Sequence, residues 1–136
     1  MCAYLIGRTV RISDGAKVRE RASDDAHRLH IQGGEIALVP LGFKARLPDG
    51  YEAQVRIRSS IAFTRGLIIP NGPGTIDADY PDEWMVMLKN DTPRVVVIEH
   101  GERIAQIVLA RYSVLTWTPG PVGVSSDRTG GIGSTG

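Results

Sequence analysis

The side chains of this chain that are suited to chemistry are carboxylates, arginines and serines, set beside glycine-rich segments. Cysteine occurs once, at Cys2, which excludes an intrachain disulfide and a zinc site built from cysteines. His27 and His30 form a His-x-x-His pair without any further ligand pattern, so we do not expect them to bind a metal. Nucleophilic catalysis has no supporting pattern. Carboxylates, arginines and backbone amides are the groups with which proteins handle phosphates.

The most informative segment is residues 71–80, Asn-Gly-Pro-Gly-Thr-Ile-Asp-Ala-Asp-Tyr. Two glycines and a proline fix a loop that leads into a short apolar step, Thr75 and Ile76. We expect the extended chain that follows to present Asp77 and Asp79 on the same side. A carboxylate placed in this way can orient a water molecule. Judged from the spacing alone, the favoured interpretation is a tight hairpin whose acidic residues face solvent.

The elements that must position these residues are short, because 16 glycines and 8 prolines punctuate the chain. Residues 51–58 alternate: apolar side chains face one way, while Glu52, Gln54, Arg56 and Arg58 face the other. Apolar, often β-branched runs predict buried strands at residues 36–39, 84–88, 95–98 and 104–114. The expected fold is all-β, a jelly-roll-like sandwich, with one short helical turn at residues 61–65 that ends at Gly66.

The length of 136 residues, 42% of them hydrophobic, fits one domain. After Trp117 almost nothing can pack, so we expect a β domain over residues 1–118 and a flexible arm over residues 119–136. The net charge of +1 argues against a nucleic-acid or membrane-surface binder, and any anionic ligand must be held by local groups. No apolar run approaches the roughly 20 residues of a membrane span. A soluble, cytoplasmic protein is the expectation.

Four segments occur in order with long stretches between them: Arg58-Ser59-Ser60, residues 71–80, Gly-Glu-Arg-Ile-Ala-Gln at 101–106, and Arg-Thr-Gly-Gly-Ile-Gly-Ser-Thr-Gly at 128–136. Together they resemble the motif set of the trimeric deoxyuridine triphosphate pyrophosphatases, the dUTPases, from about Gly34 to the last residue. The resemblance implies a jelly-roll-like β-clip fold and a homotrimer with shared active sites. It also implies Mg²⁺-dependent hydrolysis of dUTP to dUMP and pyrophosphate, which keeps uracil out of DNA and supplies dUMP for dTMP synthesis.

The resemblance also assigns roles to the residues of the hairpin. Asp77 matches the catalytic carboxylate, which acts as general base on the water that attacks the α-phosphorus. Mg²⁺ would bridge phosphate oxygens and keep several waters, so its main ligand is the substrate. Asn71 matches the side chain that faces the uracil edge, and Tyr80 the ring that packs under the deoxyribose. The positions that line this nucleoside pocket are also matched by Thr75, Ile76 and Met85.

The phosphates have a separate set of matching residues. Arg58, Ser59 and Ser60 match the contacts made by a neighbouring subunit, and Gln106 matches a glutamine that reaches the phosphates. The tail would close over the γ-phosphate like a lid, with Arg128, Ile132, Gly133, Ser134 and Thr135 as its matching residues. The family usually has an aromatic residue where this chain has Ile132. We therefore expect weaker substrate retention than in a typical member.

Two further departures from the family pattern concern the first motif and the turn after Tyr80. The first motif is shortened and altered at residues 21–27, where Asp24 and Asp25 are both candidates for its contact with a metal-bound water. After Tyr80 the usual Arg-Gly is replaced by Pro81-Asp82, which stiffens the turn and removes a cation.

Two other functions stay open at this point. The dCTP deaminases of the same superfamily share the Arg-Ser-Ser and Ile-Asp steps, but they need a glutamate where this chain has Met87, which cannot transfer protons. A catalytically weak dUTPase-like nucleotide sensor that binds a protein partner would fit the altered first motif and Ile132. The intact Asp77, Tyr80 and Gln106 favour the enzyme.

Overall fold

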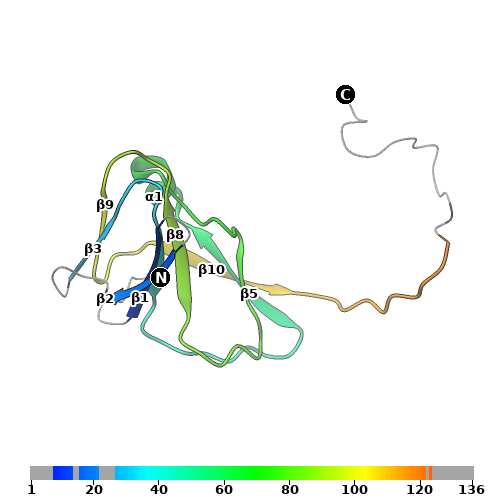
Figure 1. Cartoon of the computed structure of the whole chain (residues 1–136). Coiled ribbons are helices and arrows are strands. Elements are labelled where there is room, and N and C mark those ends of the chain that lie inside the picture. The colour runs from blue at the N-terminus through cyan, green and yellow to red at the C-terminus, as the bar shows by residue number, and fades with distance from the viewer. Residues whose placement is uncertain (1–7, 14–15, 22–26, 122, 124–136) are drawn as a thin grey trace.

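The three-dimensional structure is a computed structural model that describes residues 8–13, 16–21, 27–121 and 123 (Figure 1). Within these residues strands dominate and the only helix is short, which confirms the expected all-β class. The elements in chain order are β1 (Arg8–Ser13), β2 (Ala16–Arg21), β3 (Arg28–Ile31), β4 (Ile36–Pro40), β5 (Tyr51–Ile57), α1 (Ser59–Arg65), β6 (Leu67–Ile68), β7 (Gly74–Ile76), β8 (Met85–Asn90), β9 (Val96–Glu99) and β10 (Ala105–Arg111).

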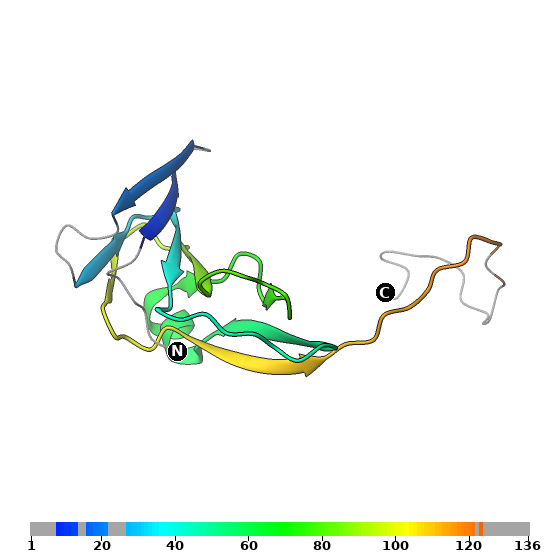
Figure 2. The ribbon, with the colours of Figure 1, turned by 90° about the horizontal axis from the view of Figure 1, so that it is seen from below.

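The strands pair in three antiparallel sheets. The largest has the order β2-β1-β4-β8-β6, the second β10-β5-β7, and the smallest pairs β3 with β9. In Figure 2 the long strands β5 and β10 run side by side beneath the rest of the fold. The predicted runs at residues 36–39, 51–58, 84–88, 95–98 and 104–114 all contain strands, whereas β1, β2, β3, β6 and β7 were not predicted. The strand in residues 104–114 is not buried as expected, because β10 after Ala105 is exposed or half-buried in the single chain.

The core forms where the apolar faces of these sheets meet. Leu29, Ile31, Leu88, Ile98 and Ile104 are fully buried there. The alternation predicted for residues 51–58 is confirmed on β5, where the Ala53 and Val55 side chains are buried while Gln54 and Arg56 lie on the other, solvent-facing side. The same sheet therefore packs one face on the core and presents the other to solvent.

One buried polar side chain ties three of these segments together. Asn90, at the end of β8, is fully buried, and its Nδ2 donates to the carbonyls of Ile31, at 2.8 Å, and of Arg94, at 2.6 Å. Its Oδ1 accepts from the backbone N–H of Thr92 at 3.0 Å. The loop between β8 and β9 is thus fixed against β3 by groups that would otherwise be buried without partners.

Helix α1 confirms the predicted helical turn but begins two residues earlier than expected. Arg58 is its N-cap, in extended conformation and without a side-chain cap, so Ser59 and Ser60 lie within the first turn. Gly66 ends the helix with a φ of 64°, the left-handed conformation that glycine adopts without strain.

Strand β10 ends at Arg111, three residues before the predicted limit. The following segment, residues 112–121, has no regular secondary structure, is exposed throughout and projects away from the sheets (Figures 1 and 2). The boundary proposed between residues 118 and 119 stays a prediction. Among the described residues, no helix has both the length and the apolar character that a membrane span requires.

Candidate active site

The sheet β10-β5-β7 carries most of the predicted site residues that the structure describes. In its register Gln106 on β10 is directly opposite Arg56 on β5, and Thr75 on β7 is directly opposite Gln54. Residues that are directly opposite in an antiparallel pair point to the same face. Gln106, Arg56, Gln54 and Thr75 therefore share the solvent-facing side of one sheet.

One end of this sheet collects the residues predicted to contact phosphates. The backbone N–H of Arg58 donates to the Ile104 carbonyl at 3.3 Å, and its Nη1 donates to the Arg103 carbonyl at 3.1 Å. These bonds fix the start of α1, where Ser59 and Ser60 are exposed, against the start of β10 with the exposed Gln106. Arg58, Ser59, Ser60 and Gln106 are thus brought together within one chain.

A second set of contacts holds the other end of α1. The Arg65 guanidinium pairs with Glu102, with Nη2 to Oε1 at 2.6 Å and Nη1 to Oε2 at 3.1 Å, and its Nη1 also donates to the Val97 carbonyl at 2.8 Å. Glu102 Oε2 in turn accepts from the backbone N–H of Glu99 at 3.0 Å. The helix and the turn between β9 and β10 are therefore locked to one another at both ends of α1.

The hairpin at residues 71–80 begins with a turn that only glycine fits well. The Gly72 N–H donates to the Ile69 carbonyl at 2.9 Å, and a Cβ at Gly72 would lie 2.9 Å from that same oxygen. Asn71 is exposed, and its amide lies close to Gly74 at the start of β7. The turn thereby places the Asn71 amide beside the backbone of β7.

Asp77 follows β7 directly and is exposed. The expectation that Asp77 and Asp79 share one side of an extended chain is wrong, because the Tyr80 N–H donates to the Asp77 carbonyl at 3.2 Å and closes a turn after Ile76. Aspartate is favoured at the first position of such turns. Asp77 is thus held at the end of the strand, and Asp79 lies in the turn itself.

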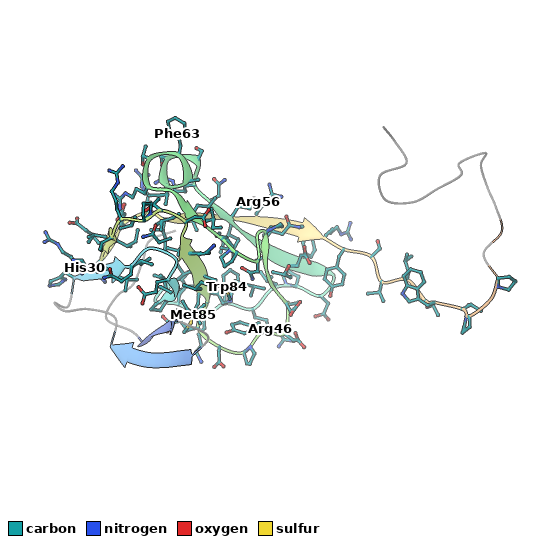
Figure 3. All side chains as sticks on the ribbon, turned by 45° about the horizontal axis from the view of Figure 1, so that its top comes forward. His30, Arg46, Arg56, Phe63, Trp84 and Met85 are labelled. Atoms are coloured by element: carbon teal, nitrogen blue, oxygen red, sulfur yellow. The ribbon has the colours of Figure 1, made fainter. Side chains whose placement is uncertain are left out.

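The other predicted nucleoside residues divide between surface and core. Thr75 and Tyr80 are exposed and Met85 is half-buried at the start of β8. The Ile76 side chain belongs to the hydrophobic core, so its backbone is the part that remains for a ligand. Met85 begins β8, and Trp84 comes just before that strand; both are labelled in Figure 3.

The chain after Tyr80 is fastened to residues 41–46 by several contacts. Gly42 N–H donates to Glu83 Oε1 at 2.8 Å, the Phe43 and Trp84 rings lie 5.2 Å apart, and Lys44 Nζ pairs with Asp82 Oδ1 at 3.3 Å. Lys44 thus places a cation beside the Pro81-Asp82 step, at which the resemblance to dUTPases predicts Arg-Gly. An open hollow of about 480 Å³ beside Tyr80 is lined in part by Lys44 and Arg46.

Comparison with known proteins identifies the family of this chain. A family model described as dUTPase matches residues 25–136. This chain belongs to the dUTPase family. The deoxyuridine 5'-triphosphate nucleotidohydrolase of Rickettsia felis is 46% identical over 107 residues, which cover 78% of this chain and 72% of that protein. The corresponding protein of Desulfotalea psychrophila is 48% identical over 107 residues, 78% of this chain and 71% of that protein.

The fold agrees with a solved member of the family. The crystal structure of dUTPase from Streptococcus mutans superposes with a TM-score of 0.61 and 28% identity, over 73% of this chain and 88% of that one. The jelly-roll-like β-sandwich expected from the resemblance to dUTPases is therefore confirmed.

Several predicted dUTPase site residues lie outside the described residues, namely Asp24, Asp25, Arg128, Ile132, Gly133, Ser134 and Thr135. Sequence patterns also missed neighbours of the site that the fold reveals, above all Arg56, Arg65 and Glu102. The alternation of residues 51–58 placed Arg56 on the solvent-facing side, but the register that sets it opposite Gln106 has no local signal.

Proposed function

We propose that this chain hydrolyses dUTP to dUMP and pyrophosphate. The proposal is supported by membership of the dUTPase family and by relatives above 40% identity that carry the name of this activity. The observation that carries it is the sheet β10-β5-β7, which leaves Asp77 exposed at the end of β7 and gathers Gln106, Ser59 and Ser60 at the start of β10.

In the proposed reaction Asp77 accepts a proton from the water that attacks the α-phosphorus. A positioned general base contributes roughly 10² to 10⁴ in rate. The rest must come from orientation and charge neutralisation, for which Arg58, Ser59, Ser60 and Gln106 supply hydrogen-bond donors and a positive charge. The bonds from Arg58 to Arg103 and Ile104 hold these donors in one geometry before substrate arrives.

Selection of uracil is proposed to come from the Asn71 side chain and the backbone of the hairpin. Uracil presents an N3 donor beside an O4 acceptor, and cytosine reverses both. A misfit leaves buried polar groups unpaired at about 1 to 3 kcal/mol each. Thr75, Ile76 and Met85 line the nucleoside pocket in this proposal, and Tyr80 packs under the deoxyribose, where a 2′-hydroxyl would collide with its ring.

The active site is proposed to be shared between copies in a homotrimer. On β10, Gln106 is opposite Arg56 of β5. On β7, which pairs with the other edge of β5, Ile76 is opposite Ala53 and comes just before Asp77. Positions 53 and 56 are three residues apart, which is roughly 10 Å along β5, and β7 and β10 are two strand spacings apart, which adds roughly 10 Å across the sheet. One chain therefore does not bring Asp77 and Gln106 to the same phosphorus. A second copy, whose Gln106 meets the Asp77 of the first, completes the site.

Exposed apolar side chains support the same assembly. Leu109, on edge strand β10, and Tyr112, Val114, Leu115 and Trp117, after it, are exposed in the single chain. An apolar stretch of this length on a projecting segment is typical of a surface that a partner covers. The proposed partner is another copy of the same chain.

Mg²⁺ is proposed as the cofactor, held mainly by substrate phosphates. Within the described residues there is no group of three or more His, Cys, Asp or Glu side chains that would form a protein cage. Mg²⁺ retains waters and is commonly bound through substrate phosphates, so the described residues fit it in this form. When bound it would neutralise charge on the phosphates, and Asp24 or Asp25 would contact one of its waters.

The tail is proposed to complete the site. In this proposal residues 119–136 form an arm that closes over the triphosphate, with Arg128 as a positive charge and Gly133, Ser134 and Thr135 as hydrogen-bond donors. Ile132 would cover the uracil by apolar contact alone.

The proposal is tested by pyrophosphate release from purified protein supplied with dUTP, dCTP, dTTP or UTP. Turnover of dUTP far above that of dCTP and UTP is expected, because cytosine reverses the N3 and O4 groups and UTP carries the 2′-hydroxyl. Thymine shares both features with uracil, so the turnover of dTTP measures how far the pocket excludes the 5-methyl group. Equal turnover of all four, or none of dUTP with Mg²⁺ present, would reject the proposal. Release of ammonia from dCTP would indicate the deaminase instead.

A further inference from the structure

Arg56 lies beside the phosphate residues without belonging to any of the motifs. It is directly opposite Gln106 in the β5 and β10 pair, and it lies two residues before Arg58, the N-cap of α1. Its side chain is exposed on the face that Gln106 shares (Figure 3). A cation at this point therefore stands next to the amide that is proposed to reach the phosphates.

The Arg56 guanidinium is already oriented by its neighbours on β5. Its Nη2 donates to Gln54 Oε1 at 2.7 Å, and Gln54 Nε2 donates to Glu52 Oε1 at 2.8 Å. These bonds form a row along the outer face of the strand. An arginine held in this way loses less conformational entropy when it binds a ligand than one that is free to rotate.

The positive charge of Arg56 is not neutralised nearby. Among residues 27–121, no carboxylate lies within ion-pair distance of Arg56, and the same holds for Arg58. The acidic end of the row, Glu52, is bonded to Gln54 and not to Arg56. Two uncompensated guanidinium groups thus flank Ser59, Ser60 and Gln106 in a chain whose net charge is only +1.

We propose that Arg56 binds the triphosphate of the substrate together with Arg58. This inference rests on the proposed function, because it concerns the ligand of the same site. The triphosphate is the most strongly charged part of the substrate, and planar guanidinium groups bind phosphate oxygens with two N–H groups at once. Arg56 would act on the β- and γ-phosphates, which are absent from the product dUMP.

The test compares Arg56→Gln and Arg56→Lys with the wild-type full chain, and uses Arg94→Gln as control. Arg94 is an exposed arginine in the loop before β9 and has no place in the proposed site. The measurements are affinity for a non-hydrolysable dUTP analogue and for dUMP, each at low and high salt, together with the sedimentation coefficient and the melting temperature.

We expect Arg56→Gln to lower the affinity for the analogue about tenfold and the affinity for dUMP less than about twofold. The affinity for the analogue should also depend less on salt concentration than in the wild type. Arg56→Lys should restore part of the affinity, because it keeps the charge but not the pair of N–H groups. Arg94→Gln should match the wild type in both affinities.

Three results would overturn the inference. Unchanged affinity of Arg56→Gln for the analogue would show that the residue does not touch the phosphates. If Arg56→Gln loses affinity for the analogue and for dUMP equally, and Arg56→Lys does not restore it, then Arg56 only supports the local fold through Gln54. Dissociation of Arg56→Gln into smaller species would place the residue between copies. In each case dUTP turnover by the wild type would leave the proposed function standing, whereas a wild-type chain that does not turn over dUTP rejects the function itself.

Discussion

At the scale of single residues, Gly72 is the position of the hairpin that least tolerates a side chain. A Cβ there would meet the Ile69 carbonyl, whose bond with the Gly72 N–H forms the turn before β7. We predict that Gly72→Ala lowers the free energy of unfolding by about 1 to 3 kcal/mol and raises the KM for dUTP, because Asn71 is displaced. Gly120→Ala, where a Cβ meets nothing, is the control for chemical denaturation and steady-state kinetics. Equal stability of both variants would contradict the prediction.

At position 132 the resemblance to dUTPases predicts an aromatic residue, and this chain has isoleucine. Stacking of a base on an aromatic ring contributes about 1 to 3 kcal/mol, and isoleucine offers no such ring. We predict that Ile132→Phe tightens binding of a non-hydrolysable dUTP analogue at least roughly fivefold, as measured by calorimetry. An unchanged affinity would mean that position 132 does not cover the uracil.

At the scale of elements, the contacts of Arg65 with Glu102 and Val97 connect α1 to the turn before β10. Arg65→Met and Glu102→Gln should each lower the free energy of unfolding by about 1 to 2 kcal/mol, since either change leaves the other partner unpaired in a partly buried site. Both should raise the KM for dUTP, because Ser59, Ser60 and Gln106 lose their fixed geometry. The double variant should lose less than the sum of the two. Strict additivity in denaturation curves would show that the pair does not act as a unit.

Asn90 connects β8 to β3 through its side-chain hydrogen bonds. Asn90→Ala leaves the carbonyls of Ile31 and Arg94 without their donor, and we predict a loss of about 2 to 4 kcal/mol in the free energy of unfolding. Gln32→Ala, an exposed amide at the end of β3, should change stability by no more than about 0.5 kcal/mol. A comparable loss in both variants would contradict this account of Asn90.

The elements were largely predictable from sequence, and the site only in part. Apolar runs marked β4, β8, β9 and β10, and the alternation of apolar and polar residues marked β5, because both patterns are local properties of a strand. Strands β1 and β2 mix charged with apolar residues, and they form strands through pairing with each other and with β4. Pairing register likewise sets Arg56 opposite Gln106, and register depends on the whole sheet. The turn at Asp77, closed by a backbone bond to Tyr80, agrees with the tight hairpin with exposed acidic residues that the spacing favoured, and not with the extended chain.

At the scale of the whole molecule, the proposed site requires a second copy of the chain, because the register places Asp77 and Gln106 far apart within one copy. If residues 112–121 are covered by another copy, Val114→Glu and Trp117→Glu should dissociate the assembly and remove activity without unfolding the β domain, because a buried charge disfavours association. Val95→Glu, also an exposed valine in the single chain, is the control. Sedimentation velocity and circular dichroism provide the readouts. An active monomer would contradict the shared site.

The most direct measurement of the central claim is pyrophosphate release from dUTP by Asp77→Asn. Asparagine keeps the size of the side chain but cannot accept the proton of the attacking water. The account predicts a fall in kcat of at least about 100-fold, with affinity for a non-hydrolysable dUTP analogue retained. Asp79→Asn, in the same turn, should keep wild-type turnover. Turnover of Asp77→Asn at the wild-type rate would contradict the account.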